Sequence, residues 1–198
     1  MSEIRLVPLA DAPWDDVRTV FGTRGDPARC WCQWFKADPA SWKASDAATA
    51  FERSLCEQVD AARAARSAGP GVLAYLGDNP IGWVAVEPSA EYPRILTGPV
   101  ITSTAEPELD RRDVWAITCF VVRVGFRRRG VSAALVQGAV ELARDGGARV
   151  VEAYPVDTAG EKLSSADLYH GALSTFEAAG FAVSGRSLDT RAVVQLAL

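Results

Sequence analysis

The spacing of apolar residues in the first third of the chain predicts one strand and two helices. Polar and apolar residues alternate from Ile4 to Leu9, which is the pattern of a strand with one buried face. Asp11 and Pro13 then suit a helix start, with Asp as the cap and Pro in the first turn. Apolar residues follow at helical spacing until glycines end the pattern: Trp14, Val17, Val20 and Phe21. A second helix, Ala47 to Ser67, has apolar residues at Ala48, Phe51, Leu55, Val59 and Ala62.

The middle of the chain predicts a β-hairpin, a long loop and a buried strand. Val72 to Leu76 and Ile81 to Val86 read as hairpin strands, joined by a loop slightly longer than the two-residue minimum. The stretch of about 87–113 holds four prolines and little periodicity, and it is longer than most connections, which favours a flexible lid or pocket rim. Val114 to Val122 is nearly all apolar, as expected for a strand covered on both faces.

The last third predicts a strand–helix–strand unit followed by a helix and a hairpin. Three arginines and Gly130 precede a helical repeat that runs from Val131 to Leu142, and Val150 to Tyr154 makes the next strand. Two strands joined this way form a right-handed parallel crossover. A further helix has apolar residues at Leu168, Ala172, Phe176 and Ala179, and it closes at Gly180. The terminal hairpin covers Phe181 to Arg186 and Ala192 to Leu198.

Composition narrows the class of protein. A chain of 198 residues, 48% hydrophobic and 23% charged, suits one globular domain. Residues 1–10 lack a long apolar core, so we expect no signal peptide, no membrane partner and a cytoplasmic location. A net charge of −4 argues against nucleic acid as a partner and mildly suits a cationic substrate.

The cysteines and the single histidine do not predict a metal site. Cys30 and Cys32 form a C-x-C pair, but no matching pair follows, so reduced thiols are the better expectation for these residues, Cys56 and Cys119. His170 is expected on a helix surface rather than as a ligand.

The basic turn before the long helix predicts a phosphate site. The first turn of a helix presents free backbone N–H groups, and the helix dipole favours negative charge there. Gly130 would let an oxygen approach the backbone, and small residues keep the first turn open at Ser132, Ala133 and Ala134. The glycine spacings of a Walker loop and of a dinucleotide loop are both absent.

This turn resembles the pyrophosphate loop of the GNAT superfamily of acyl-CoA-dependent N-acyltransferases, Arg/Gln-x-x-Gly-x-Gly/Ala. Here the motif reads Arg127-Arg128-Arg129-Gly130-Val131-Ser132, and Ser132 departs from the usual Gly or Ala. A second family pattern, Asn-x-x-Ala-x-x-x-Tyr-x-x-x-Gly-Phe, matches at three of five positions, with Tyr169 and Phe176 as the departures.

The resemblance implies an α/β (α+β) fold in one domain, 1–198. It would have a mixed, mostly antiparallel central sheet flanked by helices, with a parallel strand pair at the CoA site, and an aromatic-rich helical segment at about 26–66. It also implies acetyl-CoA as co-substrate without a metal. The expected cofactor contacts are Phe120, Val121, Val122, Arg127, Arg128, Arg129, Gly130, Val131, Ser132, Ala133, Tyr169 and Phe176.

The departures affect the expected leaving-group acid. The family's Tyr commonly protonates the thiolate, but Phe176 has no proton to give. Tyr169, seven residues earlier, would share its helix face about 10 Å away along the axis, so it is first a cofactor contact and second an acid. Ser174 could orient a water or act as a weak acid, or simply lie on the helix surface.

An amine acceptor must also lose a proton, and several residues could take it. Glu152 on a strand beside the site is the best-placed base, with Asp113 and Asp157 as alternatives. A backbone N–H between Phe120 and Val122 could stabilise the oxyanion. Cys119 could form an acyl-enzyme, although a small buried hydrophobe is the ordinary role of a free cysteine.

The acceptor site is expected near the tryptophans. Arg29 to Phe35 and the following Trp42 contain half of the six tryptophans, which either fill a core or line a pocket. Trp31, Trp34 and Trp115 are the expected substrate contacts. We expect transfer of an acetyl group to a primary amine of a small molecule. Alternatives are an acyl-CoA-binding sensor without turnover and a protein acetyltransferase, and a homodimer is left open.

Overall fold

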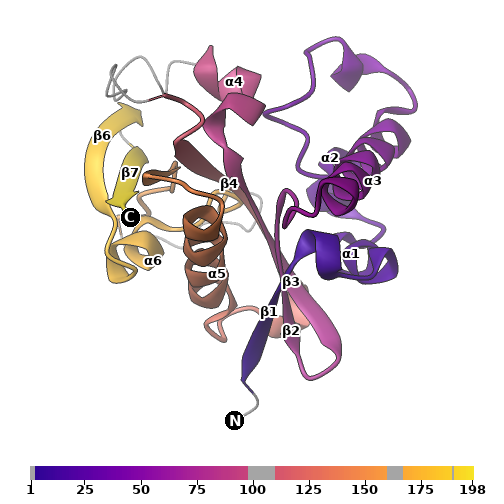
Figure 1. Cartoon of the computed structure of the whole chain (residues 1–198), viewed down its shortest axis with the longest axis horizontal. Coiled ribbons are helices and arrows are strands. Elements are labelled where there is room, and N and C mark those ends of the chain that lie inside the picture. The colour runs from indigo at the N-terminus through magenta and orange to yellow at the C-terminus, as the bar shows by residue number, and fades with distance from the viewer. Residues whose placement is uncertain (1–2, 98–109, 160–166, 189) are drawn as a thin grey trace.

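The chain folds around one mixed sheet flanked by helices, in a computed structural model that describes residues 3–97, 110–159, 167–188 and 190–198 (Figure 1). In the described residues the sheet has seven strands in the order β1-β2-β3-β4-β5-β7-β6. β4 and β5 are parallel, and the other neighbouring pairs are antiparallel, which confirms the predicted fold class. The strands are β1 (Ile4–Pro8), β2 (Gly71–Leu76), β3 (Asn79–Pro88), β4 (Val114–Val122), β5 (Val150–Ala153), β6 (Ala182–Leu188) and β7 (Arg191–Ala197).

Helices cover both faces of this sheet. Figure 1 shows α5 and α6 on one side and α1, α2 and α3 on the other. The helices are α1 (Trp14–Phe21), α2 (Gly25–Cys30), α3 (Ala47–Ala65), α4 (Pro93–Leu96), α5 (Val131–Asp145) and α6 (Leu173–Ala178). Short 3-10 turns are η1 (Leu9–Asp11), η2 (Ser41–Lys43), η3 (Ser89–Glu91) and η4 (Val124–Phe126). None of the helices in the described ranges is long and apolar enough to cross a membrane.

Each face has its own apolar core. Leu135 and Ala139 of α5 belong to the core on one face of the sheet, while Leu55 of α3 and Trp83 of β3 belong to the core on the opposite face. β3 serves both cores because successive side chains of a strand point to opposite faces. A third, smaller cluster lies near α4, with Phe35 packed against it: Tyr92, Ile95, Ala116, Tyr154 and Val193.

Three local predictions were wrong in their details. Asp11 does not cap α1, because it lies in η1 and the helix begins after Pro13, which has an extended backbone. The hairpin loop is only Gly77 and Asp78, since Asn79 already pairs with Leu76. The expected loop of about 87–113 begins with the end of β3, η3 and α4, and residues 98–109 of it lie outside the described residues.

The parallel pairing of β4 with β5 ends before β4 does. It runs from Val114 opposite Val150 to Ile117 opposite Ala153, and β4 continues to Val122. Thr118 forms a β-bulge, because Ile117 pairs with Val86 and Cys119 with Ala85 on β3. We call the place where β5 leaves β4 the notch, defined by residues 118–122 of β4.

A short turn, residues 168–171, lies along the notch instead of forming a helix, and the Gly171 N–H closes it on the Leu168 carbonyl at 2.9 Å. The Phe120 N–H donates to the Tyr169 carbonyl at 2.7 Å, and the His170 Nδ1 donates to the Thr118 carbonyl at 2.7 Å. Gly171 has a φ of +81°, and α6 begins only at Leu173. The predicted helix was therefore wrong before residue 173, and Tyr169 does not share a helix face with Phe176.

Candidate functional site

The basic turn leads directly into the open N-terminus of α5. Gly130 is the N-cap residue with a φ of +77°, a backbone conformation that glycine adopts without strain. Among the described residues, no side chain caps this helix, and its first turn carries no acidic side chain. The first-turn N–H groups are therefore available to an anion, which the helix dipole attracts.

A hollow of about 240 Å³ lies in front of this helix end. It joins the end of β4, the basic turn, the first turn of α5 and α6. A Cβ added to Gly130 would meet nothing within 4 Å, so the backbone faces open space there. The lining residues are Val122, Arg127, Arg128, Gly130, Val131, Ser132, Ala133 and Thr175.

The three arginines of the turn are not equivalent. Arg127 and Arg128 line the hollow, and the Arg127 Nε donates to the Val122 carbonyl at 3.1 Å. Arg129 instead places its guanidinium 5.8 Å from the centre of the Phe126 ring. Arg128 has a φ of +57°, which is uncommon for a residue with a side chain. Arg127 and Arg128 therefore give the hollow a positive charge that suits a pyrophosphate.

Thr175 is a lining residue that sequence reasoning missed. It precedes Phe176 in the second matched pattern, but the pattern itself assigns no role to this position. α6 buries Phe176 completely, edge-on to Phe120 at 5.9 Å and Phe181 at 5.2 Å between ring centres. Thr175, which precedes Phe176, therefore faces the hollow.

Several expected cofactor contacts lie elsewhere. Phe120 and Phe176 belong to the core under α5, and Val121 belongs to the core on the opposite face. Tyr169 and Arg129 do not line the hollow either. The hollow thus gathers the residues expected for the phosphates, while those expected for the acyl end lie along the notch or in the cores.

Most of the sequence matches the model of one protein family. The sequence model described as the Acetyltransferase (GNAT) family matches residues 28–171, which is more than half of the chain. The chain belongs to the GNAT family of acetyltransferases. No curated protein sequence matches it significantly.

Several solved structures share the fold. PaiA N-acetyltransferase from Thermoplasma acidophilum, in complex with coenzyme A, has a TM-score of 0.55 and 9% identity, covering 99% of both chains. The GNAT domain of S. lividans PAT has a TM-score of 0.51 and 17% identity, covering 98% of this chain and 89% of its own. Ard1 from Thermoplasma volcanium has a TM-score of 0.51 and 13% identity, covering 99% and 97%. At these identities the likeness concerns the fold alone.

Glu152, the expected base, is a buried and fully engaged carboxylate in this GNAT protein. Its side chain is 1% exposed. Its Oε1 accepts hydrogen bonds from the Tyr154 hydroxyl and from Arg111 at 3.4 Å, and its Oε2 accepts one from Gln195 at 2.9 Å. The three donors occupy both oxygens of Glu152, so this carboxylate joins Arg111, Tyr154 and Gln195 inside the protein.

The other proposed acids and bases lie near the surface or in backbone turns. Asp157 pairs with Arg186 at 2.8 Å, and this hydrogen bond lowers the pKa of Asp157. Asp113 uses its carbonyl to accept the Arg149 N–H at 2.8 Å. Ser174 is exposed in the first turn of α6. The structure does not bring these three side chains together with Glu152.

His170 is buried beside the notch, so its predicted surface position was wrong. It is 3% exposed and its ring centre lies 4.0 Å from that of Tyr169. Because a carbonyl can only accept, Nδ1 must carry the proton that bonds Thr118, and Nε2 is left as an acceptor. Burial, aided by the nearby Arg191 charge, lowers the pKa of His170 to about 3. Burial also raises the pKa of Tyr169.

One amide of the expected oxyanion site already has a partner. The Phe120 N–H, within the stretch expected to face a thioester carbonyl, donates to the Tyr169 carbonyl. A ligand oxygen could use this amide only by displacing that carbonyl.

The three tryptophans expected at the acceptor site do not line one surface. Trp31 stacks on Phe21 at 4.7 Å inside the core, and Trp34 is 42% exposed with the Arg94 guanidinium 4.0 Å from its ring centre. Trp115 lies on the α5 side, where a Cβ on Gly146 would fall 2.2 Å from its ring. Cys119 is buried in the same core as Trp31. Among the described residues, no group of three or more potential ligands is arranged to hold a metal ion.

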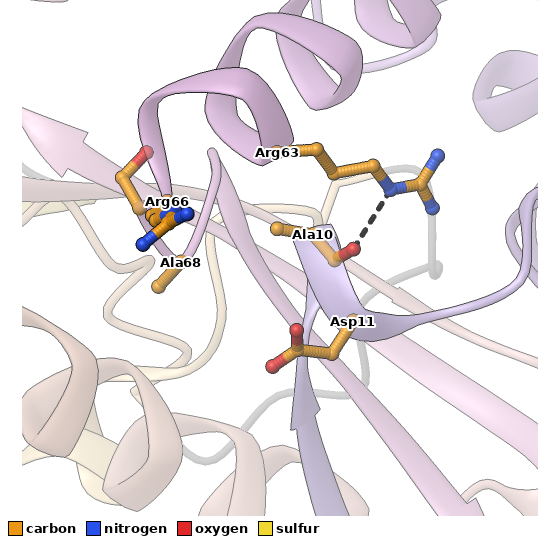
Figure 2. A pocket seen from close by; sticks show the side chains of 6 residues that line it. Ala10, Asp11, Arg63, Arg66 and Ala68 are labelled. Carbon is orange, nitrogen blue, oxygen red and sulfur yellow. Dashed lines mark hydrogen bonds between the residues drawn. The ribbon is translucent and has the colours of Figure 1, made fainter.

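A larger hollow, of about 460 Å³, lies away from these residues between η1 and the end of α3 (Figure 2). Arg63 crosses it and donates from Nε to the Ala10 carbonyl at 2.8 Å, the bond drawn in Figure 2. The same guanidinium donates to the Ala12 carbonyl at 2.7 Å. These bonds fix η1 to α3. The hollow therefore results from a structural contact that Arg63 makes between these two elements.

Proposed function

We propose that this protein is an acetyl-CoA-dependent N-acetyltransferase that acetylates the primary amine of a small molecule by direct transfer. The observation that carries the proposal is the hollow at the uncapped N-terminus of α5, with Arg127 and Arg128 in its wall. Family membership supports the same reaction class.

The residues of the hollow fit the pyrophosphate of the co-substrate. The first-turn N–H groups of α5 and the two guanidinium groups would bind the phosphate oxygens, and the Ser132 and Thr175 hydroxyls add two further donors. Acetyl-CoA supplies an activated acetyl group, whose C–S bond breaks as the N–C bond to the amine forms. The departing CoA thiol resembles that of cysteine, whose pKa is about 8.5, so its thiolate can leave without a dedicated acid at residue 176.

The acceptor side is expected on the face of the sheet that carries α1–α3. Phe35 packs over the sheet beside the notch, and the rings of Trp34 and Trp42 meet edge to face with their centres 5.0 Å apart. Side chains packed in this way favour an enclosed site over an open peptide groove. This supports a small molecule as the acceptor.

Acceptor-dependent thiol release tests the proposal. The purified protein is mixed with acetyl-CoA and with arylalkylamines, aliphatic diamines, amino acids or a lysine peptide in separate reactions. We expect thiol release above the no-amine background with at least one small amine. Release with the lysine peptide alone would point to a protein substrate instead.

A second candidate function is an acyl-CoA-binding module without turnover. The buried Phe176 and the occupied Phe120 amide favour it, because the acid of the family pattern is missing and an expected oxyanion donor is engaged. Micromolar acetyl-CoA affinity by calorimetry, together with no acceptor-dependent thiol from the whole panel, would establish this candidate and reject the enzyme.

A further inference from the structure

Two hydroxyl groups buried beside the notch lack a hydrogen-bond partner among the residues that the structure describes. Tyr92 is fully buried and Thr118 is 1% exposed. In the described part of the chain, neither the Tyr92 hydroxyl nor the Thr118 hydroxyl makes a hydrogen bond of good geometry. A buried orphan hydroxyl costs about 1–3 kcal/mol, so its presence calls for an explanation.

A second largely buried carboxylate, Glu87, lies near the Tyr92 hydroxyl, and both Glu87 and Thr118 influence the pKa of Tyr92. The Lys36 ammonium connects the two side chains, because it pairs with Glu87 and lies 5.4 Å from the centre of the Tyr92 ring. Glu87 and Glu152 both lie opposite Ala116 of β4, one on β3 and one on β5, so the two carboxylates flank the same strand position.

The two carboxylates differ in how well they are satisfied. Glu152 has hydrogen-bond donors on both oxygens, as described above. The Oε2 of Glu87 forms an ion pair with Lys36 but no well-formed hydrogen bond with any described residue. Glu87 therefore has an oxygen left for a further hydrogen bond, whereas both oxygens of Glu152 are engaged.

The surroundings of Glu87 favour its neutral form. Its side chain is 16% exposed, and burial raises its pKa, with Glu91 adding to the effect. Lys36 opposes this shift, but its ammonium group is shared, because it also donates to Gln58 at 2.7 Å. Burial and the Glu87 charge raise the pKa of Tyr92 well above its usual value, so the phenol stays neutral.

We propose that the acceptor amine loses its proton through the Tyr92 hydroxyl to Glu87. In this step, which rests on the proposed function, the amine N–H bond breaks as the proton moves to Tyr92 Oη, and the phenol proton moves to Glu87 Oε2. Tyr92 is unchanged overall and Glu87 becomes neutral, and the partly exposed carboxyl then returns the proton to solvent. Thr118, at the bulge, connects the notch to the phenol and positions it. The amine lone pair is left free to form the N–C bond.

Tyr92→Phe separates this role from a structural one. Removing an orphan hydroxyl should leave the free energy of unfolding unchanged or slightly higher. It should lower kcat about 100-fold with the best amine of the panel, within the range found for acid–base groups. The matched control is Tyr75→Phe on β2, because the part-buried Tyr75 hydroxyl donates to Asp16 of α1 at 2.9 Å. This control should lose stability and keep its kcat.

Glu87→Gln tests the end of the relay by its pH profile. In the wild type, kcat should rise with pH as Glu87 ionises, and Glu87→Gln should lose this rise along with most of the rate. Glu87→Asp should restore part of both. A wild-type rate or an unchanged acid limb in Tyr92→Phe or Glu87→Gln would overturn the relay while leaving the acetyltransferase intact. A wild type that releases no thiol with any amine would overturn the proposed function and the relay together.

Discussion

His170 is held neutral inside the protein by its surroundings. It is 3% exposed, the Arg191 charge opposes protonation, and its one ring donor is engaged by the Thr118 carbonyl. Burial and the Arg191 charge lower its pKa from 6.5 to about 3, although the Thr118 hydrogen bond acts in the opposite direction. Between these two values the unfolded chain binds a proton at His170 that the folded chain does not. Stability from this residue is therefore fully present above pH 6.5 and is lost as the pH falls toward 3.

The predicted size of this effect is measurable. Between pH 7 and pH 5, proton uptake by the unfolded state should cost about 2 kcal/mol of unfolding free energy at this residue. His170→Asn keeps a donor for the Thr118 carbonyl but cannot titrate in this range. Urea unfolding of both proteins at both pH values should show a smaller loss in His170→Asn by about that amount. Equal losses in the two proteins would contradict the buried, neutral histidine.

At the scale of one element, the N-terminus of α5 predicts a difference between two neighbouring arginines. Arg128 lines the hollow, whereas Arg129 lies over the Phe126 ring. Arg128→Ala should weaken acetyl-CoA binding about tenfold or more through the loss of a charge-assisted phosphate contact, which contributes about 1.5–3 kcal/mol. Arg129→Ala removes the same charge one residue away and should weaken binding much less. Calorimetry with acetyl-CoA measures both, and equal effects would mean that net charge alone attracts the ligand.

The elements that sequence predicts well are those fixed by local patterns. The apolar run of β4 and the helical repeat of α5 gave the strand at Val114–Val122 and the helix from Val131. Residues 168–172 also have helical spacing, but bonds to β4 and the left-handed Gly171 hold them in a turn that does not continue as a helix. Those bonds join positions about fifty residues apart in the chain, so periodicity alone could not reveal them.

In the candidate site, too, the residues that are close together in sequence were predictable and those that the fold brings together were not. The hollow at the N-terminus of α5 was predictable, because its arginines, its glycine and the start of the helix are contiguous in sequence. Thr175, Glu87 and Tyr92 were missed, since they approach the site from three other elements and carry no local motif. The tryptophan-rich segment was ambiguous between core and pocket, and the structure places Trp31 in the core and Trp34 at the surface.

For the whole molecule, the continuous sheet predicts a single cooperative unfolding transition. β3 and β4 contribute side chains to the cores on both faces, so neither helical layer can detach without exposing apolar residues of the same strands. Trp31 and Trp83 report on one face and Trp115 on the other. Tryptophan fluorescence and circular dichroism at about 222 nm should therefore give the same urea midpoint, as for other small two-state domains. An earlier midpoint in fluorescence would show that α1–α3 unfold separately from the sheet, because most of the tryptophans lie on their side. The acceptor face would then be a separately folding layer, and acetyl-CoA bound at α5 would raise only the second midpoint.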